Sequence, residues 1–396
     1  MSKELNLSMK ENCIVVHYSE IGTKKGNRDF FEMKLIENLR RKLKNAGVNR
    51  VYRRYGRVVC DMENGADPDR LTYSLERTPG VSNFMFAMKA PLDIEEIKKT
   101  SCALLEGESF DTFRVSATRS YKDFPFSSQE VNEIVGEYIS SKLEKKVRLK
   151  DFDVELHIEI CEKEAFVGCK KFRGIGGLPV GSSGKLLCSL SGGIDSPVAA
   201  FMMMKRGCNI IFVHIYNSLQ VGEELLKKIR DIVEKLTEFQ IRSKLYIVPF
   251  ESLQKKIIAS IPSRYRMIIY RRYMMRILDK LCMKEGCGGI VTGDSIAQVA
   301  SQTIENLNCI FEVSSFPVFS PLIGMNKEEI VEMAKKIGTY EISIRPYPDC
   351  CSFMIAEHPE TRARSEELVK LESLLDGADE LVEECIGRAK IEVIEL

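Results

Sequence analysis

The sequence predicts an α/β protein in which two small α+β domains precede a doubly wound parallel sheet. Three observations point to this fold. Strand-like apolar runs alternate with amphipathic helices from Leu186 onward. Residues 186–200 place a strand, a glycine-rich turn and a helix in direct succession. Residues 172–185 are dense in glycine and serine, which indicates a linker in front of the sheet.

The first predicted domain covers residues 1–66 and is rich in basic residues. Its expected elements are a strand, an amphipathic helix and a second strand, at residues 14–18, 29–47 and 51–60. Between Thr23 and Arg57 the chain has twelve Lys or Arg and three Asp or Glu. These cations form either a nucleic-acid contact or an ordinary solvated helix face. The cluster comprises Arg40, Arg41, Lys42, Lys44, Arg53, Arg54 and Arg57.

The second predicted domain covers residues 67–171 and repeats a small α+β pattern. Helices and strands are expected in alternation, with helices at 94–105 and 129–143 and strands at 112–120 and 154–171. Ser127 or Ser128 is expected to cap the second of these helices. Phe124 and Phe126 flank a proline before that helix, where they either stack on nucleic-acid bases or pack against the helix.

The third predicted domain covers residues 186–396 and contains the doubly wound sheet. Its expected strands are LLCSL, NIIFVHIY, KLYIVPF, GGIVTG and FPVFSPL, with helices between them. EISIRP, residues 341–346, is also strand-like, and the segment after Glu357 predicts acidic helix and a short final strand. Open parallel sheets bind ligands at the carboxyl ends of their strands, so we expect the functional site there.

The loop Ser-Gly-Gly-Ile-Asp-Ser, after the first of these strands, has the features of a phosphate-binding turn. Gly192 and Gly193 leave backbone N–H groups open to an anion at the start of a helix. Ser191 and Ser196 add hydroxyl groups. Asp195 would repel phosphate unless a cation lay between them, which suggests Mg²⁺. A plain turn with a helix cap is the alternative, but strand, loop, helix and next strand together form a βαβ unit that favours nucleotide binding.

A second polar loop, residues 292–303, follows another expected strand. Gly293 permits close backbone approach, while Gln298 and Gln302 offer uncharged hydrogen-bonding groups suited to a base or ribose. A capped helix start would look much the same. Basic side chains on the helix over 268–286 and just before it can clamp phosphate or form surface ion pairs, and Arg271 is favoured over Arg266 and Arg272.

The thirteen cysteines, without a CxxC pair or a secretory signal, indicate reduced thiols in a cytoplasmic protein. No apolar run reaches the ~18 residues of a membrane span. Most thiols are expected to be inert core groups. Cys350 and Cys351 differ because they lie in a proline-rich turn predicted to be exposed, where a thiolate can carry sulfur as a persulfide. Metal or cluster binding, by Cys282, Cys287 and Cys350, is the rival use.

Taken together, these segments resemble the tRNA 4-thiouridine synthetases, the tRNA sulfurtransferase family, over almost the whole chain. The matching stretches are HYSEIGTKKGNRDFF, FRVSATRSYKDFPFSSQEVN, GGLPVGSSGK, SGGIDSPVA, TGDSIAQVASQT, PLIGMNKEEI, IGTYEISI and PDCC. The resemblance implies a ferredoxin-like domain at 1–66, a THUMP RNA-binding domain at 67–171, a linker at 172–185 and a PP-loop ATP pyrophosphatase domain at 186–396. The last domain belongs to the adenine nucleotide alpha hydrolase-like type.

The resemblance also implies a reaction. The front domains bind tRNA, MgATP adenylates O4 of the uridine at position eight, and sulfur from a cysteine persulfide replaces that oxygen. AMP and pyrophosphate leave. By position, Asp195 and its loop handle pyrophosphate and Cys350 carries the sulfur. The implied ATP-binding residues are Leu187, Cys188, Ser191, Gly192, Gly193, Asp195, Ser196, Phe212, Val213, Arg271, Gly293 and Gln302.

One departure from the family concerns the sulfur donor. Long bacterial members end in a rhodanese domain that carries the persulfide, whereas this chain continues for only some 45 residues after Cys351. We therefore expect sulfur from a separate cysteine desulfurase, another carrier or free sulfide, with Cys351 resolving the intermediate. The bacterial second role, sulfur supply to a carrier protein for thiamine biosynthesis, becomes doubtful. An iron–sulfur cluster, used by some short archaeal relatives, is not favoured, and a homodimer is one of the oligomeric states left open.

Two other functions compete with tRNA thiolation. One is a different PP-loop enzyme that adenylates and modifies tRNA. The other is a non-catalytic tRNA-binding protein with a disused ATP site, which the intact loop from Ser191 to Ser196 disfavours.

Overall fold

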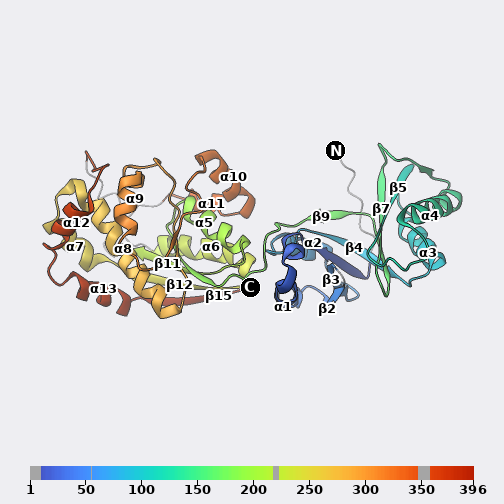
Figure 1. Ribbon diagram of the computed structural model, residues 1–396, viewed down its shortest axis with the longest axis horizontal. Coiled ribbons are helices and arrows are strands. Elements are labelled where there is room, and N and C mark those ends of the chain that lie inside the picture. Colours follow the sequence, from blue (N-terminus) through green and yellow to red (C-terminus); the bar gives the residue numbers. More distant parts are fainter. Residues whose placement is uncertain (1–9, 55, 217–222, 347–356) are drawn as a thin grey trace. The chain divides into compact units, whose positions relative to one another are not determined.

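The computed structural model describes residues 10–54, 56–216, 223–346 and 357–396. The chain forms two compact units, Met1–Pro179 and Val180–Leu396, each a set of helices packed on a sheet (Figure 1). The division falls inside the glycine- and serine-rich segment 172–185. None of the helices in the described ranges is long and apolar enough to cross a membrane.

The first half of the front unit has the βαββαβ order of a ferredoxin-like fold. Its strands pair antiparallel in the order β2-β3-β1-β4, and buried leucines of the two long helices pack against Ile14, Val16 and Phe84. The elements are β1 Cys13–His17, η1 Glu20–Thr23, η2 Lys25–Asn27, α1 Arg28–Leu43, β2 Val48–Arg54, β3 Arg57–Met62, α2 Pro68–Glu76 and β4 Asn83–Ala90. Elements on both sides of residue 66 therefore share one sheet, and the domain boundary there stays a prediction.

The segment 51–60, expected as one strand, is part of a hairpin. β2 and β3 pair antiparallel around Gly56, whose φ of +77° lies in the left-handed region that glycine adopts at low cost. The strand expected at 154–171 is likewise divided, into β7 Val154–Ile160, β8 Ala165–Gly168 and β9 Lys171–Arg173. Each turn interrupts the apolar pattern by only a few residues, so periodicity alone did not reveal it.

The second half of the front unit extends the same sheet. β4 pairs with β1 along its start and with β8 along its end, which gives nine strands in all with β9 beside β4. Ser127 caps α4 in a capping box, as one of the two predicted caps. Phe124 is buried in the core and Phe126 packs beside it, so both serve packing. The remaining elements are α3 Ile94–Leu105, β5 Thr112–Arg119, α4 Ser128–Leu143 and β6 Lys146–Val147.

The second unit contains a six-stranded sheet in the order β14-β13-β10-β11-β12-β15, parallel except for the edge strand β15. The chain moves outward from β10 through β11 and β12, then returns to place β13 on the other side of β10. The strand order thus reverses between β10 and β13, where ligands of such sheets bind. The strands are β10 Lys185–Ser189, β11 Asn209–Tyr216, β12 Arg242–Pro249, β13 Ile290–Val291, β14 Val318–Phe319 and β15 Lys390–Glu395.

Helices cover this sheet, and the central one is α8, whose buried side chains dominate the core. EISIRP is not strand-like in the structure, because α11 directly follows the Gly338 cap of α10 and packs against α6 and α10. The helices are α5 Asp195–Lys205, α6 Glu223–Gln240, α7 Glu251–Ser260, α8 Ser263–Glu285, η4 Ala300–Gln302, α9 Ile304–Phe311, α10 Lys327–Ile337, α11 Tyr340–Ser343, α12 Ser365–Glu372 and α13 Ala378–Gly387.

Candidate active site

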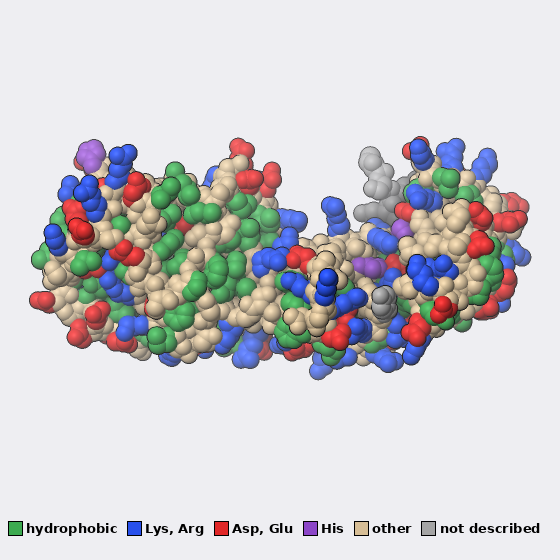
Figure 2. Space-filling model, in the orientation of Figure 1, with side chains coloured by type: hydrophobic (Ala, Val, Ile, Leu, Met, Phe, Trp, Pro, Cys, Tyr) green, Lys and Arg blue, Asp and Glu red, His purple; other side chains and the backbone are tan. Residues whose placement is uncertain are grey.

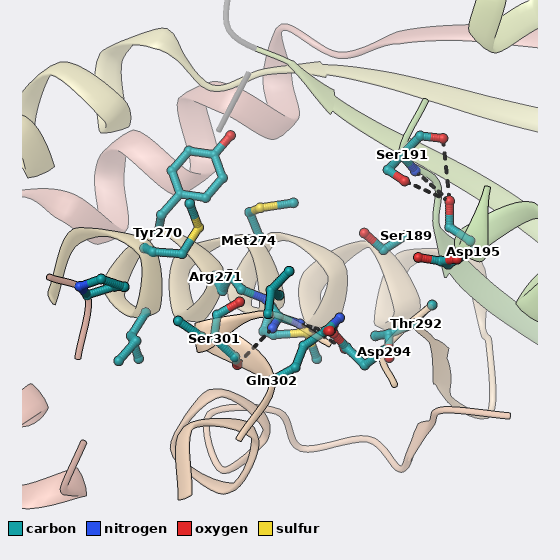
Figure 3. Close-up of a pocket in the computed structure, with 18 of the residues that line it drawn as sticks. Ser189, Ser191, Asp195, Tyr270, Arg271, Met274, Thr292, Asp294, Ser301 and Gln302 are labelled. Atoms are coloured by element: carbon teal, nitrogen blue, oxygen red, sulfur yellow. Dashed lines mark hydrogen bonds and ion pairs between the residues drawn. The ribbon is translucent and has the colours of Figure 1, made fainter. Parts of the chain in front are cut away.

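The loop between β10 and α5 is closed by its own serines. The Ser191 amide donates to the Ser196 hydroxyl at 2.8 Å, and the two hydroxyl oxygens lie 3.0 Å apart (Figure 3). The Gly193 amide donates to the Ser191 hydroxyl at 3.3 Å. α5 begins immediately afterwards without a side-chain N-cap. Its first-turn amides and the positive end of its dipole therefore remain for an anion.

The loop after β13 packs directly on this first loop. A Cβ on Gly293 would lie 2.7 Å from the Ser196 amide nitrogen and 2.9 Å from its Cα, closer than real Cβ atoms approach. Only glycine allows the contact. The two loops, about a hundred residues apart in the sequence, thus form one site at the point where the strand order reverses.

Asp294 joins two of the predicted ATP-binding residues. Both of its carboxylate oxygens accept from Nη2 of Arg271 at 2.8 Å, and one also accepts from Nε2 of Gln302 at 2.9 Å (Figure 3). Nη1 of Arg271 donates to the Ser301 carbonyl oxygen at 3.3 Å. Asp294 is only 4% exposed. The guanidinium and the amide are therefore held in place by one buried carboxylate from the second loop.

A cavity of about 560 Å³ opens beside the two loops. One wall is apolar and comes from α8, through Met267, Ile268 and Leu278 among others. The polar part of the lining includes the predicted residues Ser191, Asp195, Ser196, Gly293 and Gln302 from the loops, and Arg271 from α8 itself. An apolar wall with a few convergent polar groups and a helix N-terminus suits a nucleotide, whose base is flat and whose phosphates are anionic.

Asp195, at the first turn of α5, has two partners that the sequence did not reveal. Its oxygens accept from Nε2 of Gln298 at 2.9 Å and from Nζ of Lys327 at 2.5 Å. Lys327 begins α10, 132 residues further along the chain. The Lys327 ammonium thus already compensates the negative charge of Asp195, which would otherwise repel phosphate.

A second cavity, of about 470 Å³, adjoins the first and shares Ser189, Ser191, Tyr270 and Met274 with it. Gly192 and Gly193 line it, together with Leu190, His214, Ile215, Lys228 and the residues from Ser343 to Pro346. The loop after β10 therefore contributes residues to both cavities.

The four predicted strand residues lie within the sheet. Leu187 and Cys188 on β10, and Phe212 and Val213 on β11, are fully buried within the sheet and line neither cavity. The lining positions lie two residues further along each strand, at Ser189, Leu190, His214 and Ile215. Because ligands bind beyond the carboxyl ends of parallel strands, contacts of the four buried residues with ATP would come from backbone groups, and their role stays a prediction.

Two of the three arginines singled out in the sequence have structural roles. Arg272 is buried and forms ion pairs with Glu312 and Glu372, which joins α8 to α9 and α12. Arg266 donates to the carbonyl oxygens of Ile258 and Ile261. Of these three arginines, Arg271 alone lines the first cavity, to which Arg264 also contributes.

The predicted sulfur chemistry falls largely outside the described residues. Cys350 and Cys351 lie in the segment 347–356, which the structure does not describe. Cys282 and Cys287 are buried at the end of α8, where burial raises the pKa of both thiols, that of Cys282 to about 12. Neither thiol is poised as a thiolate.

The basic cluster of the front unit is mostly paired internally. Arg53 forms ion pairs with Asp29 and Glu32, Arg54 with Glu164 and Arg57 with Glu159, while Arg40 donates to a backbone carbonyl. Figure 2 shows Lys and Arg interspersed with Asp and Glu over this unit. Arg41, Lys44 and Arg50 are exposed.

Replacing Asp294 by asparagine is expected to raise the KM for ATP about tenfold. The reason is that Arg271 loses a charged partner whose two carboxylate oxygens both accept hydrogen bonds from its guanidinium. The side chain keeps its size, so kcat should change less. The measurement is pyrophosphate release as a function of ATP concentration, in the tRNA-dependent reaction that the sequence resemblance implies. Asp279→Asn is a matched control, since Asp279 also accepts several hydrogen bonds, from Ser314 and Ser315, but does not line either cavity. An unchanged KM for ATP would show that Asp294 does not support ATP binding through Arg271.

His214 makes the stability of the second unit depend on pH. It is 2% exposed, its Nδ1 donates to the Leu190 carbonyl oxygen at 2.9 Å, and burial lowers its pKa from 6.5 to about 4. As pH falls from 6.5 to 4, the unfolded chain binds a proton that the folded chain does not, so the free energy of unfolding falls by about 3 kcal/mol. Urea unfolding at several pH values should show this loss in the wild type and a smaller loss in His214→Asn. Equal losses in both would contradict the assignment.

Comparisons with known proteins cover nearly the whole chain. Three family models match: "ThiI ferredoxin-like domain" at residues 13–85, "THUMP domain" at 92–170 and "Thiamine biosynthesis protein (ThiI)" at 181–376. A probable tRNA sulfurtransferase of Thermoanaerobacter sp. (strain X514) is 39% identical over 367 residues, 92% of this chain and 96% of the relative. That of Geobacillus kaustophilus is 39% identical over 391 residues, 98% and 97% of the two chains.

The fold comparison agrees. The crystal structure of a 4-thiouridine synthetase in complex with RNA and ATP superposes with a TM-score of 0.88 at 37% identity and covers 98% of this chain and all of the other. The order of the three matched families is the order of domains predicted from the sequence.

Proposed function

The chain belongs to the tRNA sulfurtransferase family, and from this membership we infer that it catalyses ATP-dependent thiolation of tRNA. One observation of the structure supports this inference independently of the sequence similarity. The loops after β10 and β13 meet at the contact that only Gly293 allows, and they surround a nucleotide-sized cavity with Arg271, Asp294 and Gln302. This arrangement supports the proposal that the chain binds and splits ATP.

The first step is adenylation of the tRNA. O4 of the target uridine, the residue at position eight, attacks the α-phosphorus of ATP, and the bond to the β-phosphate breaks so that pyrophosphate leaves. The first-turn amides of α5 and the Ser191 and Ser196 hydroxyls would bind the departing anion. Arg271, held by Asp294, would stabilise negative charge that develops on the phosphates.

Asp195 is the residue that would hold Mg²⁺. Among the residues that the structure describes, no three His, Cys, Asp or Glu side chains group in a way suited to a metal ion. Mg²⁺ in nucleotide sites uses one or two protein carboxylates together with phosphate oxygens and water, so a single carboxylate beside the phosphate loop fits. When bound, the ion would neutralise phosphate charge, and Lys327 would share the carboxylate or move to the phosphates.

The second step exchanges oxygen for sulfur. The outer sulfur of a persulfide on Cys350 attacks C4 of the uracil, and the C4–O4 bond breaks so that AMP leaves with the former O4. The Cys351 thiolate then attacks the Cys350 sulfur, which releases 4-thiouridine and leaves a disulfide that a cellular thiol reduces. Both cysteines lie outside the described residues, and the proposal for them depends on the resemblance.

Sulfur would come from a cysteine desulfurase, which transfers it to Cys350. The matched family model is named for thiamine biosynthesis. Transfer of sulfur onward to a carrier protein of that pathway would need the same thiol. The front unit would bind the tRNA, and its exposed cations Arg41, Lys44 and Arg50 are available to phosphates.

The test is to incubate the full chain with unmodified tRNA, MgATP, cysteine and a cysteine desulfurase, and then to analyse the nucleosides. We expect 4-thiouridine from the wild type and none from Cys350→Ser. If sulfide restores product to Cys350→Ser, Cys350 only relays sulfur. Pyrophosphate release without 4-thiouridine would instead indicate another adenylating tRNA modification, and the absence of both would indicate a binding protein.

A further inference from the structure

Lys228 is a buried lysine that the proposed reaction does not yet use. It lies on α6, is 5% exposed and lines the second cavity. Its Nζ donates to the carbonyl oxygens of Ser343 at 2.8 Å and Arg345 at 3.0 Å. Burial and the nearby charge of Arg345 lower its pKa. Removing an ammonium from water is costly. The hydrogen bonds to the Ser343 and Arg345 carbonyl oxygens offset part of this cost and tie the Lys228 ammonium to that segment.

The segment that Lys228 holds is the end of α11. The last carbonyl groups of a helix have no partner within the helix and carry partial negative charge, which an ammonium satisfies well. A second side chain of α6 holds the same segment, because Asp231, one turn after Lys228, pairs with the Arg345 guanidinium. Ser343 and Arg345 are therefore held from one face of one helix.

This segment and the glycine loop line the same cavity. Gly192 and Gly193 lie on its wall together with Ser343, Ile344 and Arg345. Cys350 follows Arg345 by five residues, a stretch that spans at most about 18 Å when fully extended. The position of Arg345 thus limits where a thiol on residue 350 can go, relative to the loop that would release pyrophosphate.

We propose that Lys228 is a positioning residue for sulfur transfer: its ammonium fixes residues 343–345 beside the glycine loop, so that the Cys350 persulfide reaches the activated uracil. In this assignment Lys228 acts through the backbone of residues 343–345 and not on the reacting atoms. The proposal depends on the proposed function, and it assigns Lys228 to the second chemical step and not to the first.

Two products, measured in one reaction, test this assignment. The full chain, with its persulfide formed beforehand by a cysteine desulfurase, is mixed with MgATP and unmodified tRNA for a single turnover, and both pyrophosphate and 4-thiouridine are followed. In Lys228→Met we expect 4-thiouridine to form about 10- to 100-fold more slowly, because two carbonyl groups lose a charge-assisted partner. Pyrophosphate release should stay within about twofold of the wild type.

Three further variants complete the design. Lys227→Met is the matched control, since Lys227 is the exposed neighbour on the same helix, and it should match the wild type. Lys228→Arg keeps the charge and should recover part of the rate. If Lys228→Met does not fold, Asp231→Asn removes the second tie to Arg345 and should slow 4-thiouridine formation selectively, by a smaller factor.

The ratio of the two products distinguishes the explanations. An equal fall in pyrophosphate and 4-thiouridine would assign Lys228 a merely structural role and overturn the proposal. Wild-type 4-thiouridine formation in Lys228→Met would overturn it as well. If the wild type itself releases pyrophosphate but forms no 4-thiouridine, the proposed function fails, and the proposal for Lys228 fails with it.

Discussion

Replacing Gly293 by alanine is expected to slow tRNA-dependent pyrophosphate release about 100-fold, because forcing a methyl group into packed backbone costs about 1–3 kcal/mol. The new Cβ would meet the backbone of Ser196 at 2.7 Å. Backbone atoms cannot rotate aside as a flexible side chain does, so the loops after β10 and β13 must separate. Asp294 would move with the second loop and carry Arg271 away from the phosphates.

Gly288→Ala is the matched control for this prediction. Gly288 precedes the same strand, but its Cβ would meet only the Lys185 carbonyl oxygen at 3.8 Å, an ordinary contact. We expect wild-type rates from this variant, and thermal unfolding of both proteins separates loss of fold from loss of the site. Normal pyrophosphate release by Gly293→Ala would show that the two loops do not form one nucleotide site.

The second large effect is expected for Asp195→Asn, which should lower the rate of adenylation by about 100-fold or more. Asparagine keeps the size and one acceptor oxygen, but it removes the charge that Lys327 compensates and that would hold Mg²⁺. The measurement is pyrophosphate release across a Mg²⁺ titration. The variant should need more Mg²⁺ than the wild type to reach its half-maximal rate.

Asp279→Asn again serves as the control, because it removes a hydrogen-bonded carboxylate of the same unit away from both cavities. It should leave the Mg²⁺ dependence unchanged. If Asp195→Asn retained both the wild-type rate and the wild-type Mg²⁺ dependence, the carboxylate would have no role in binding the ion.

The fold class was predictable because its signals are local. The strand, glycine loop and helix around Ser191 follow one another within fifteen residues, and the structure confirms them as β10 and α5. The alternation of strands and helices after Leu186 likewise predicted the parallel sheet, which is also confirmed. The two hairpins of the front unit were missed, because their tight turns interrupt the apolar pattern by only a few residues.

The partners of the site residues were not predictable, because they come from distant segments. Nothing near Asp195 in the sequence indicates Lys327 as its partner. Asp294 was not singled out, because the glycine before it was the more informative residue of that loop. For the basic cluster of the front domain, the sequence left open a nucleic-acid contact and an ordinary solvated helix face. The sequence shows only that basic residues are numerous there. Arg53, Arg54 and Arg57 form ion pairs with carboxylates that come close to them only in the folded chain.

In the proposed reaction, uracil O4 attacks ATP before sulfur enters. Its most direct test uses tRNA whose uridine at position eight carries ¹⁸O at O4, with mass analysis of the AMP and pyrophosphate released during thiolation. Because the C4–O4 bond breaks only after O4 has joined the α-phosphorus, we predict one ¹⁸O in every AMP formed with 4-thiouridine and none in pyrophosphate. Unlabelled AMP, with the ¹⁸O in water or pyrophosphate, would contradict the account.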